Sequence, residues 1–191
     1  MSKGRLEAFS DGVLAIILTI MVLELKVPHE ADLKALIPLA PKFFFYVLSF
    51  VYVGIYWNNH HHLWQAAKGV NGPILWANMH LLFWLSLIPF VTGWMGENNF
   101  ALMPVVLYGG VLWFAGLAYY ILTRALIAHH GQDSLLAEAI GKDSKGLWSL
   151  YIYTAAIPLA FLAPWLAALL YVVVAIMWLI PDRRIETKLK K

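Results

Sequence analysis

The sequence predicts an all-α integral membrane protein with six transmembrane helices, on the evidence of its composition and the spacing of its charges. Of 191 residues, 61% are hydrophobic and only 13% are charged, whereas about a quarter of a typical soluble domain is charged. Asp, Glu, Lys and Arg do not occur in residues 43–67, 69–96, 98–123 and 146–180. Stretches of this length and polarity are typical of membrane spans, so we expect one membrane domain over residues 1–191.

The uncharged stretches set the number of spans. Each of the first three is one helix long, but the last has 35 residues and would be about 52 Å long as one helix, too long for a single crossing. Pro164 near its centre disfavours helix at the preceding residue and suits a tight hairpin. With the N-terminal segment, the six expected spans are at about 5–26, 41–65, 71–95, 101–124, 147–163 and 165–181.

The distribution of Lys and Arg orients these spans. With both termini in the cytosol, eleven of the 14 basic residues lie inside, which agrees with the positive-inside rule. The inner ones are Lys3, Arg5, Lys68, Arg124, Lys142, Lys145, Arg183, Arg184, Lys188, Lys190 and Lys191, and the outer ones are Lys26, Lys34 and Lys42. The loop at about 125–145 is then the only sizeable extramembrane piece, and Pro89 is expected to kink the third span.

The first span is too short and too charged to face lipid. Only the twelve uncharged residues 12–23 separate Asp11 from Glu24, and as a helix they cover about 18 Å of a hydrocarbon core about 30 Å thick. Charges inside a membrane normally face a bundle interior or a water-filled cavity. We therefore expect the first helix to be surrounded by the other five helices or by neighbouring subunits.

Helical geometry divides this first span into two faces. At about 100° per residue, Ile16, Ile20 and Leu23 form one apolar stripe with Thr19 beside it, while Asp11 projects to the opposite side. The same spacing is also that of ordinary helix packing. The stripe therefore marks a face of the helix without deciding what covers it.

Polar residues of the first three spans are expected at one depth in the membrane. The second span carries WNNHHHLW at residues 57–64, and the third carries Asn78 within LWANMHLL. Because successive spans run in opposite directions, Ser10, Asp11, His60 and Asn78 can meet in an interhelical hydrogen-bond network. We expect such a network to hold the first helix in place.

These residues also form motifs. The first span starts with R-x-x-x-F-S-D, formed by Arg5, Phe9, Ser10 and Asp11. The second span has W-x-x-H-x-x-L-W from Trp57 to Trp64, and Asn78, Pro89 and Thr92 follow in the third. In this order they resemble the lysosomal potassium channel family, transmembrane protein 175, in its bacterial six-span form. The last three spans share little with that family beyond hydropathy.

The resemblance implies a potassium-permeable cation channel, assembled as a homotetramer in a bacterial inner membrane with both termini cytoplasmic. In that family the first helices line a central pore and large apolar side chains narrow it. The implied constriction falls on Ile16, Thr19, Ile20 and Leu23, and the implied motif and network residues are Arg5, Phe9, Ser10, Asp11, Trp57, His60 and Asn78. The pattern requires one histidine, which leaves His61 and His62 without a role.

The apolar side chains of the implied pore helix suggest a mechanism for ion selectivity. The sequence contains no T-V-G-Y-G filter, so selectivity would arise where an ion sheds part of its hydration shell at the apolar constriction. Glu24, repeated in four subunits near the outer mouth, would raise the local cation concentration. The expected partners are membrane lipids, K⁺ and further copies of the chain, with no cofactor, resident metal ion or nucleic acid.

Three other functions stay open. The consecutive histidines suggest an intramembrane metalloenzyme, but metal ligands on a helix are spaced i, i+3 or i+4 rather than side by side, and we expect no enzyme. A proton channel or proton-coupled transporter would use Asp11 and His60, because intramembrane ionisable residues mark proton relays. The third is a scaffold without transport activity.

Overall fold

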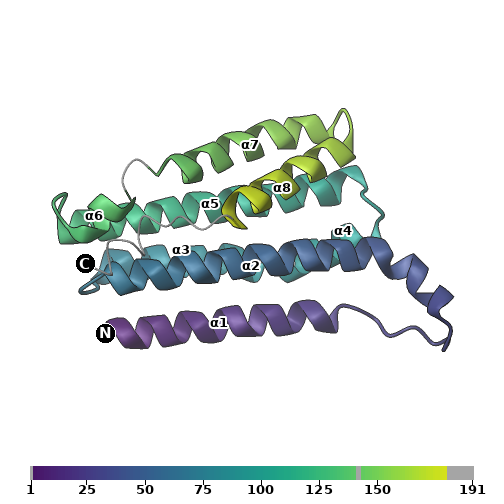
Figure 1. Ribbon diagram of the computed structural model, residues 1–191, viewed down its shortest axis with the longest axis horizontal. Helices are drawn as coiled ribbons and strands as arrows, with labels where there is room; N and C mark the ends of the chain where they lie inside the picture. Colours follow the sequence, from purple (N-terminus) through teal and green to yellow (C-terminus); the bar gives the residue numbers. More distant parts are fainter. Residues whose placement is uncertain (1, 141–142, 180–191) are drawn as a thin grey trace.

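The computed structural model describes residues 2–140 and 143–179, and these residues form helices and connecting loops with no β-strand (Figure 1). The prediction of an all-helical protein is therefore confirmed for this part of the chain. The elements are α1 (Lys3–Leu23), the 3₁₀ helix η1 (Leu33–Leu39), α2 (Ala40–Ala66), α3 (Gly72–Ser86), α4 (Ile88–Glu97), α5 (Leu102–His130), α6 (Leu135–Ile140), α7 (Ser144–Ala160) and α8 (Pro164–Leu179).

Four helical stretches are long and apolar enough to cross a membrane: α1, η1 with α2, α3 with α4, and α5. Helices α7 and α8 have 17 and 16 residues and lie where the fifth and sixth spans are expected. They meet at a hairpin, and Pro164 is the first residue of α8. The predicted end of the sixth span at residues 180–181 lies outside the described residues, as do Lys142, Arg183, Arg184, Lys188, Lys190 and Lys191.

The fourth helical stretch is longer than the span expected at about 101–124. Helix α5 continues to His130 and ends at Gly131, which has a φ of 90°, a value that favours glycine. Arg124 lies within the helix, and its guanidinium is over the Tyr120 ring, 4.9 Å from the centroid. The expected cytosolic loop at 125–145 is therefore largely helical, with the end of α5 followed by the short helix α6. A charge ends a hydrophobic run but does not end a helix.

The third span is interrupted near Pro89. Helix α3 ends at Ser86 and α4 begins at Ile88, so the break lies just before the proline. Pro89 has no N–H to donate to the carbonyl of Leu85, and its ring crowds that carbonyl. The two helices therefore follow one another as two segments of one membrane-spanning stretch.

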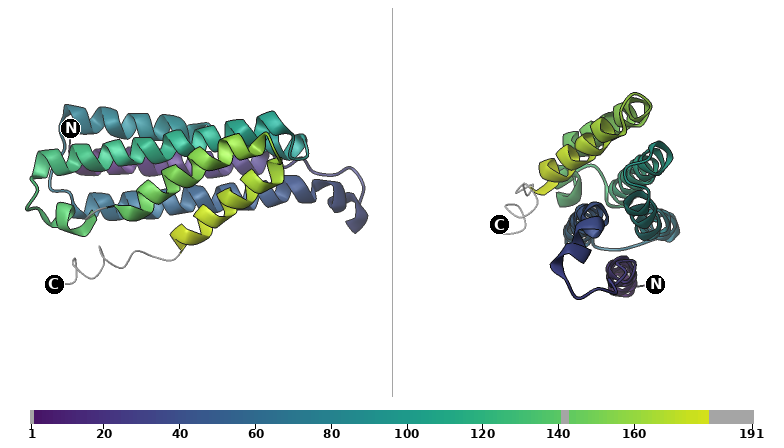
Figure 2. Two further views of the ribbon diagram at one scale, coloured as in Figure 1. Left: turned by 90° about the horizontal axis from the view of Figure 1, so that it is seen from above. Right: turned by 90° about the vertical axis from the view of Figure 1, so that its right-hand side faces the viewer.

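Helix α1 lies at one edge of the bundle. It packs against α2, α3 and α4, whereas α5 packs between this group and the α7–α8 hairpin. The end view shows α1 and the hairpin on opposite sides of the molecule (Figure 2). The expectation that the other five helices surround α1 is therefore wrong for a single subunit. The face of α1 turned away from α2, α3 and α4 is covered by no residue that the structure describes.

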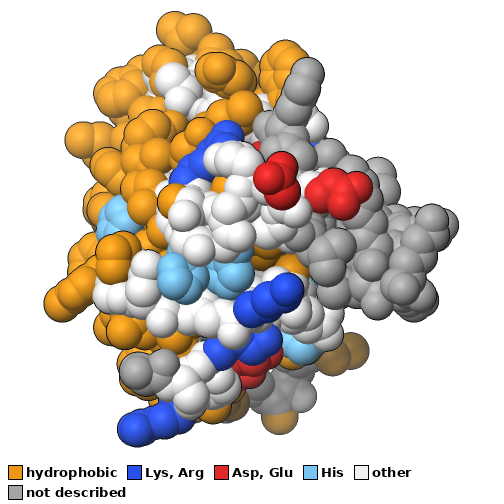
Figure 3. All heavy atoms as spheres, turned by 90° about the vertical axis from the view of Figure 1, so that its left-hand side faces the viewer, with side chains coloured by type: hydrophobic (Ala, Val, Ile, Leu, Met, Phe, Trp, Pro, Cys, Tyr) orange, Lys and Arg blue, Asp and Glu red, His pale blue; other side chains and the backbone are white. Residues whose placement is uncertain are grey.

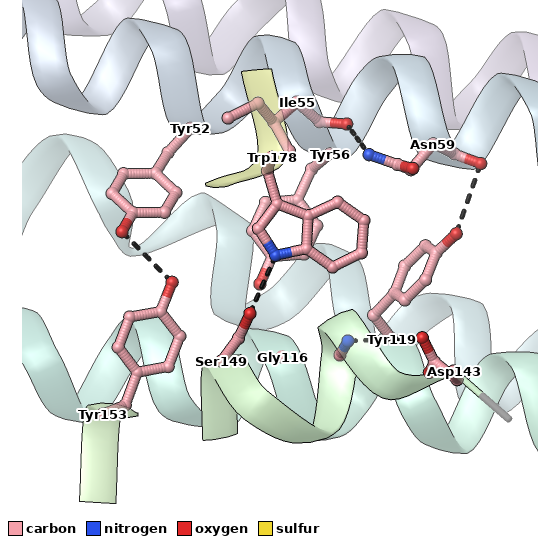
Figure 4. Close-up of a pocket in the computed structure, with 11 residues that line it drawn as sticks. Tyr52, Ile55, Tyr56, Asn59, Gly116, Tyr119, Asp143, Ser149, Tyr153 and Trp178 are labelled. Carbon is pink, nitrogen blue, oxygen red and sulfur yellow. Dashed lines mark hydrogen bonds between the residues drawn. The ribbon is translucent and has the colours of Figure 1, made fainter. Parts of the chain in front are cut away.

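Hydroxyl groups join the helices in the middle of the bundle. Thr92 of α4 donates to Ser49 of α2 at 2.7 Å, and Ser49 and Tyr108 of α5 share a hydrogen bond of 2.9 Å. Tyr153 of α7 donates to the hydroxyl of Tyr52, 3.1 Å away, which the close-up shows (Figure 4). Buried polar groups must find partners within a membrane protein, and these pairs tie α2 to α4, α5 and α7.

Beside these groups lies a small cavity of about 40 Å³, which has room for only a few water molecules. Its lining comes from α2, α5, α7, α8 and Asp143, as Figure 4 shows, with the Trp178 indole donating to Ser149 at 2.8 Å. Tyr119 donates to the carbonyl of Asn59 at 3.3 Å. The cavity therefore belongs to the packing of the second half of the bundle and lies apart from α1.

Candidate ion pathway along the first helix

A buried hydrogen-bond network joins α1, α2 and α3 at one end of the bundle. The amide nitrogen of Asn78 donates to Ser10 Oγ at 3.0 Å, and the amide oxygen of Asn78 lies 2.8 Å from His60 Nε2. Since that oxygen can only accept, Nε2 of His60 carries the proton. The Trp64 indole nitrogen lies 2.8 Å from Nε2 and 3.1 Å from Nδ1, and with the proton on Nε2 only Nδ1 has a lone pair to accept its N–H. Ser10, His60 and Asn78 are almost completely buried.

A second pair of contacts joins the acidic side of α1 to α2. The Trp57 indole donates to an Asp11 carboxylate oxygen at 3.1 Å, and His61 Nδ1 lies 3.5 Å from a carboxylate oxygen of Glu7. The Trp57 and His61 rings are stacked, with centroids 6.1 Å apart. Asp11 is half-buried and points toward α2 rather than toward the apolar stripe. Glu7 and His61, which sequence reasoning left out, thus lie beside the motif residues.

Two motif residues lie apart from this network. Arg5 is exposed and makes no hydrogen bond or ion pair to any residue that the structure describes, and Phe9 is exposed. The cation that does join α1 to its neighbour is Lys3, whose Nζ donates to the carbonyls of Trp64 and Ala67 at 2.7 and 3.0 Å. These carbonyls are at the end of α2, where a helix lacks internal partners for them. No local sequence signal distinguishes Lys3 from Arg5 in this respect.

The predicted constriction residues lie on the outer surface of the subunit. Ile16, Ile20 and Leu23 are 60%, 42% and 74% exposed, and Thr19 is exposed beside them with its hydroxyl bonded to the carbonyl of Ala15. The opposite face of α1 is buried and consists of Leu6, Ser10, Leu14, Ile17 and Met21. One face thus packs on α2, α3 and α4, and the stripe is left uncovered.

The C-terminal end of α1 adjoins a groove with charged side chains. Glu24 and Ile20 line this groove of about 370 Å³ together with Ser86 of α3 and residues of α4, including Glu97. Glu97 pairs with Lys42 at 3.1 Å and with Lys26 at 3.8 Å, and Lys42 is buried. Sequence reasoning assigned Lys26 and Lys42 only to the outer side of the membrane. Their joint partner could not be foreseen, because Glu97 is far from both in sequence.

The consecutive histidines of α2 face different partners. His60 lies in the buried network, whereas His61 contacts Glu7 and Gln65. Within residues 2–140 and 143–179, no group of three His, Asp or Glu side chains is placed to hold a metal ion. The geometry of the described residues therefore offers no support for the metalloenzyme interpretation.

Comparison with known proteins assigns this arrangement to a family. The sequence profile described as endosomal/lysosomal potassium channel TMEM175 matches residues 5–89. A protein named potassium channel from Chryseobacterium sp. (strain P1-3) is 55% identical over 191 residues, which is the whole of both chains. The chain belongs to the TMEM175 family. The resemblance predicted from the motifs is confirmed, and the family is one of ion channels rather than enzymes.

Other TMEM175 relatives cover most of the chain. A protein named potassium channel from Chamaesiphon minutus is 30% identical, with 91% of each chain covered. The crystal structure titled as a lysosomal potassium-selective channel TMEM175 homolog from Chamaesiphon minutus matches with a TM-score of 0.81 at 28% identity, covering 94% of this chain and 97% of that one. The mouse relative, named endosomal/lysosomal proton channel TMEM175, is 27% identical, with 85% of this chain and 36% of the mouse protein covered.

Proposed function

We propose that the chain is one subunit of a potassium-permeable channel whose pore is lined by α1. The observation that carries this proposal is the exposed apolar stripe of α1, which lies between Asp11 and Glu24 in the sequence. The uncharged part of α1 is about 18 Å long and does not match a hydrocarbon core of about 30 Å. This face is therefore better matched to contact with water and neighbouring copies of α1 than to contact with lipid.

In the proposed channel, Ile16, Ile20 and Leu23 form the narrowest part of the pore with Thr19 beside them. K⁺ holds its hydration shell less tightly than Na⁺ does, so an apolar ring that strips part of that shell favours K⁺. Glu24 would attract cations at the outer mouth. The Ser10–Asn78–His60 network holds the other face of α1 and so positions the stripe.

The assembly that this requires has several copies of α1 around one axis, and a homotetramer is the form that we propose. Helices α7 and α8 complete six spans, with both termini cytoplasmic in a bacterial inner membrane. The bacterial relatives named potassium channels support this function. Conduction needs only K⁺ and lipid, with no cofactor.

Proton permeation is the second candidate, since the vertebrate relatives are named proton channels. It would use Asp11 and His60. In the structure both ring nitrogens of His60 are engaged by Asn78 and Trp64, and Asp11 bonds to Trp57 on the side of α1 away from the stripe. A proton path through these groups would therefore differ from the path that K⁺ takes along the stripe.

The test is the reversal potential of purified protein in planar bilayers with K⁺ on one side and Na⁺ on the other at equal pH. We expect a shift toward the K⁺ equilibrium potential. Ile16→Asn should raise the current and weaken K⁺/Na⁺ discrimination, because an amide in the constriction replaces part of the lost hydration. The control Ile176→Asn places the same change on an exposed residue of α8 and should alter neither quantity.

Two results would contradict the proposal. Unchanged selectivity in a conducting Ile16→Asn channel would remove Ile16 from the filter. A reversal potential that stays near zero with opposed K⁺ and Na⁺, and moves only with a pH gradient, would favour the proton channel.

A further inference from the structure

The turn between α2 and α3 is held by two histidines that the channel mechanism does not use. His130, the last residue of α5, places its Nε2 2.9 Å from the backbone nitrogen of Lys68 and 3.2 Å from that of Gly69. Its Nδ1 lies 2.9 Å from the carbonyl oxygen of Leu126. Figure 3 looks onto this end of the molecule, where His, Lys and Arg side chains gather.

These partners fix the protonation state of His130. A backbone N–H can only donate, so Nε2 must carry a lone pair to accept from Lys68 and Gly69. A carbonyl oxygen can only accept, so Nδ1 must carry the proton that bonds to Leu126. The contacts are thus those of the neutral ring with its proton on Nδ1. A protonated ring would instead direct an N–H at two backbone N–H groups.

His129 is constrained in the same way through Asn71. The Asn71 side-chain oxygen accepts from the backbone nitrogen of Ile74 at 3.0 Å and caps the start of α3. The amide nitrogen of Asn71 is therefore the group that lies 3.2 Å from His129 Nδ1. Because this nitrogen can only donate, His129 Nδ1 must accept, and it can do so only while unprotonated.

Lys3 contacts the same turn from the side of α1. Its Nζ donates to the carbonyls of Trp64 and Ala67, at the end of α2. The turn is thus held by acceptors from α5 and by a donor from the first turn of α1. A change in the turn is transmitted to the start of α1 through these two hydrogen bonds.

Charged side chains of both signs lie at this end of the bundle. The ionisable side chains of the described elements there are Lys3, Arg5 and Glu7 on α1, His61, His62 and Lys68 on α2 and the turn, Arg124 and His129 on α5, Asp133 in the loop after α5, and Glu138 on α6.

We propose that His129 and His130 form a pH-dependent latch, closed when both rings are neutral, that fixes the α2–α3 turn and with it the start of α1. Acid on this side of the membrane protonates the rings, removes both acceptors and releases the turn. The sign follows from linkage: the released state binds more protons, so the latch is stable at high pH and is lost as pH falls.

The test measures hydrogen exchange at the Lys68 and Gly69 amides at pH 7.5 and 5.5, each rate divided by that of an unstructured peptide of the same sequence. Protection in the wild-type protein should be severalfold lower at pH 5.5 than at pH 7.5, because protonation of the two rings removes the acceptors of the turn. In the double variant His129→Asn/His130→Gln, side-chain oxygens take the places of the two acceptor nitrogens and do not titrate, so protection should not depend on pH.

Two further variants complete the design. His29→Gln changes an exposed histidine in the loop that follows α1, at the other end of the bundle, and should retain the wild-type pH response. His130→Ala should lower protection at both pH values, and its melting temperature shows whether the bundle is still folded. Equal wild-type protection at both pH values, or an undiminished fall in the double variant, would overturn the latch.

The effect on current rests on the proposed function and is measured separately. In bilayers, K⁺ current should respond to pH on the side of the α2–α3 turn in the wild-type channel and not in the double variant. A conducting wild-type channel without that response would overturn the coupling to α1. Absence of K⁺ current at every pH would instead count against the proposed function, while hydrogen exchange still decides the latch.

Discussion

Asn78 is the residue on which the contact between three helices depends most. Its side chain is fully buried and uses both ends of the amide, toward Ser10 on α1 and His60 on α2. Both partners, Ser10 and His60, are themselves almost completely buried. A residue of another type at this position leaves two buried polar groups without partners, and such groups each cost about 1–3 kcal/mol.

Asn78→Ala is therefore expected to destabilise the protein by about 1–3 kcal/mol. Because hydrogen bonds between membrane helices contribute little on average, we expect a value at the lower end of this range. The measurement is the melting temperature of purified protein in detergent. Asn58→Ala, at an exposed position of α2, is the matched control and should melt as the wild type does. Equal melting of both variants would show that the network contributes nothing to stability.

At the scale of elements, α2 and α4 approach more closely than helices with ordinary side chains can. A Cβ added at Gly96 would lie 2.8 Å from Lys42 Cα and 2.9 Å from its Cγ. The short α4 is separated from α3 at Leu87, so its position depends on this contact and on the Lys42–Glu97 pair. The groove beside Glu24 is bounded by the same helix.

Gly96→Ala should push α2 and α4 apart and destabilise the bundle by about 1–3 kcal/mol, the usual range for overpacking. Gly110→Ala in α5 is the control, because no atom lies within 4 Å of a Cβ added there and alanine favours helix by about 1 kcal/mol over glycine. Thermal unfolding of the two variants should thus shift in opposite directions. A Gly96→Ala protein as stable as the wild type would argue against close packing of α2 and α4.

At the scale of the whole molecule, the edge position of α1 leaves a subunit incomplete. The stripe of Ile16, Ile20 and Leu23 is exposed on one side, and the α7–α8 hairpin lies on the opposite side (Figure 2). Copies related by rotation about an axis beside α1 would bring the stripes together and keep the hairpins at the periphery. The proposed pore is therefore a property of the assembly and not of one chain.

Because the chain has no cysteine, a single introduced thiol reports on this arrangement. Leu23→Cys should give covalent dimers when the protein in membranes is treated with a short bismaleimide, since the copies of residue 23 would face one another across the proposed pore. Leu162→Cys, at an 81% exposed position of the α7–α8 hairpin, should remain monomeric on denaturing gels. Dimers formed through residue 162 but not through residue 23 would place the hairpin, rather than α1, at the subunit interface.

Hydropathy and charge spacing were enough to predict an all-helical membrane protein, and the family was predicted from residue motifs in the first three spans. Membrane character is a property summed along each helix, and the R-x-x-x-F-S-D and W-x-x-H motifs lie within single spans, so both are visible without a fold. The break near Pro89 is equally local, because one residue removes the hydrogen bond. The continuation of α5 to His130 was not predicted, because the charge of Arg124 ends the hydrophobic run without ending the helix.

Only the tertiary structure decided which residues meet. Lys3 rather than Arg5 caps α2, Lys26 and Lys42 share Glu97, and His130 accepts from Lys68. Each of these contacts joins residues more than fifty positions apart, and which one forms depends on how the helices pack. The edge position of α1 also depends on how the helices pack. The sequence of a hydrophobic stripe is the same whether the stripe packs against its own chain, packs against a neighbouring subunit or lines a pore.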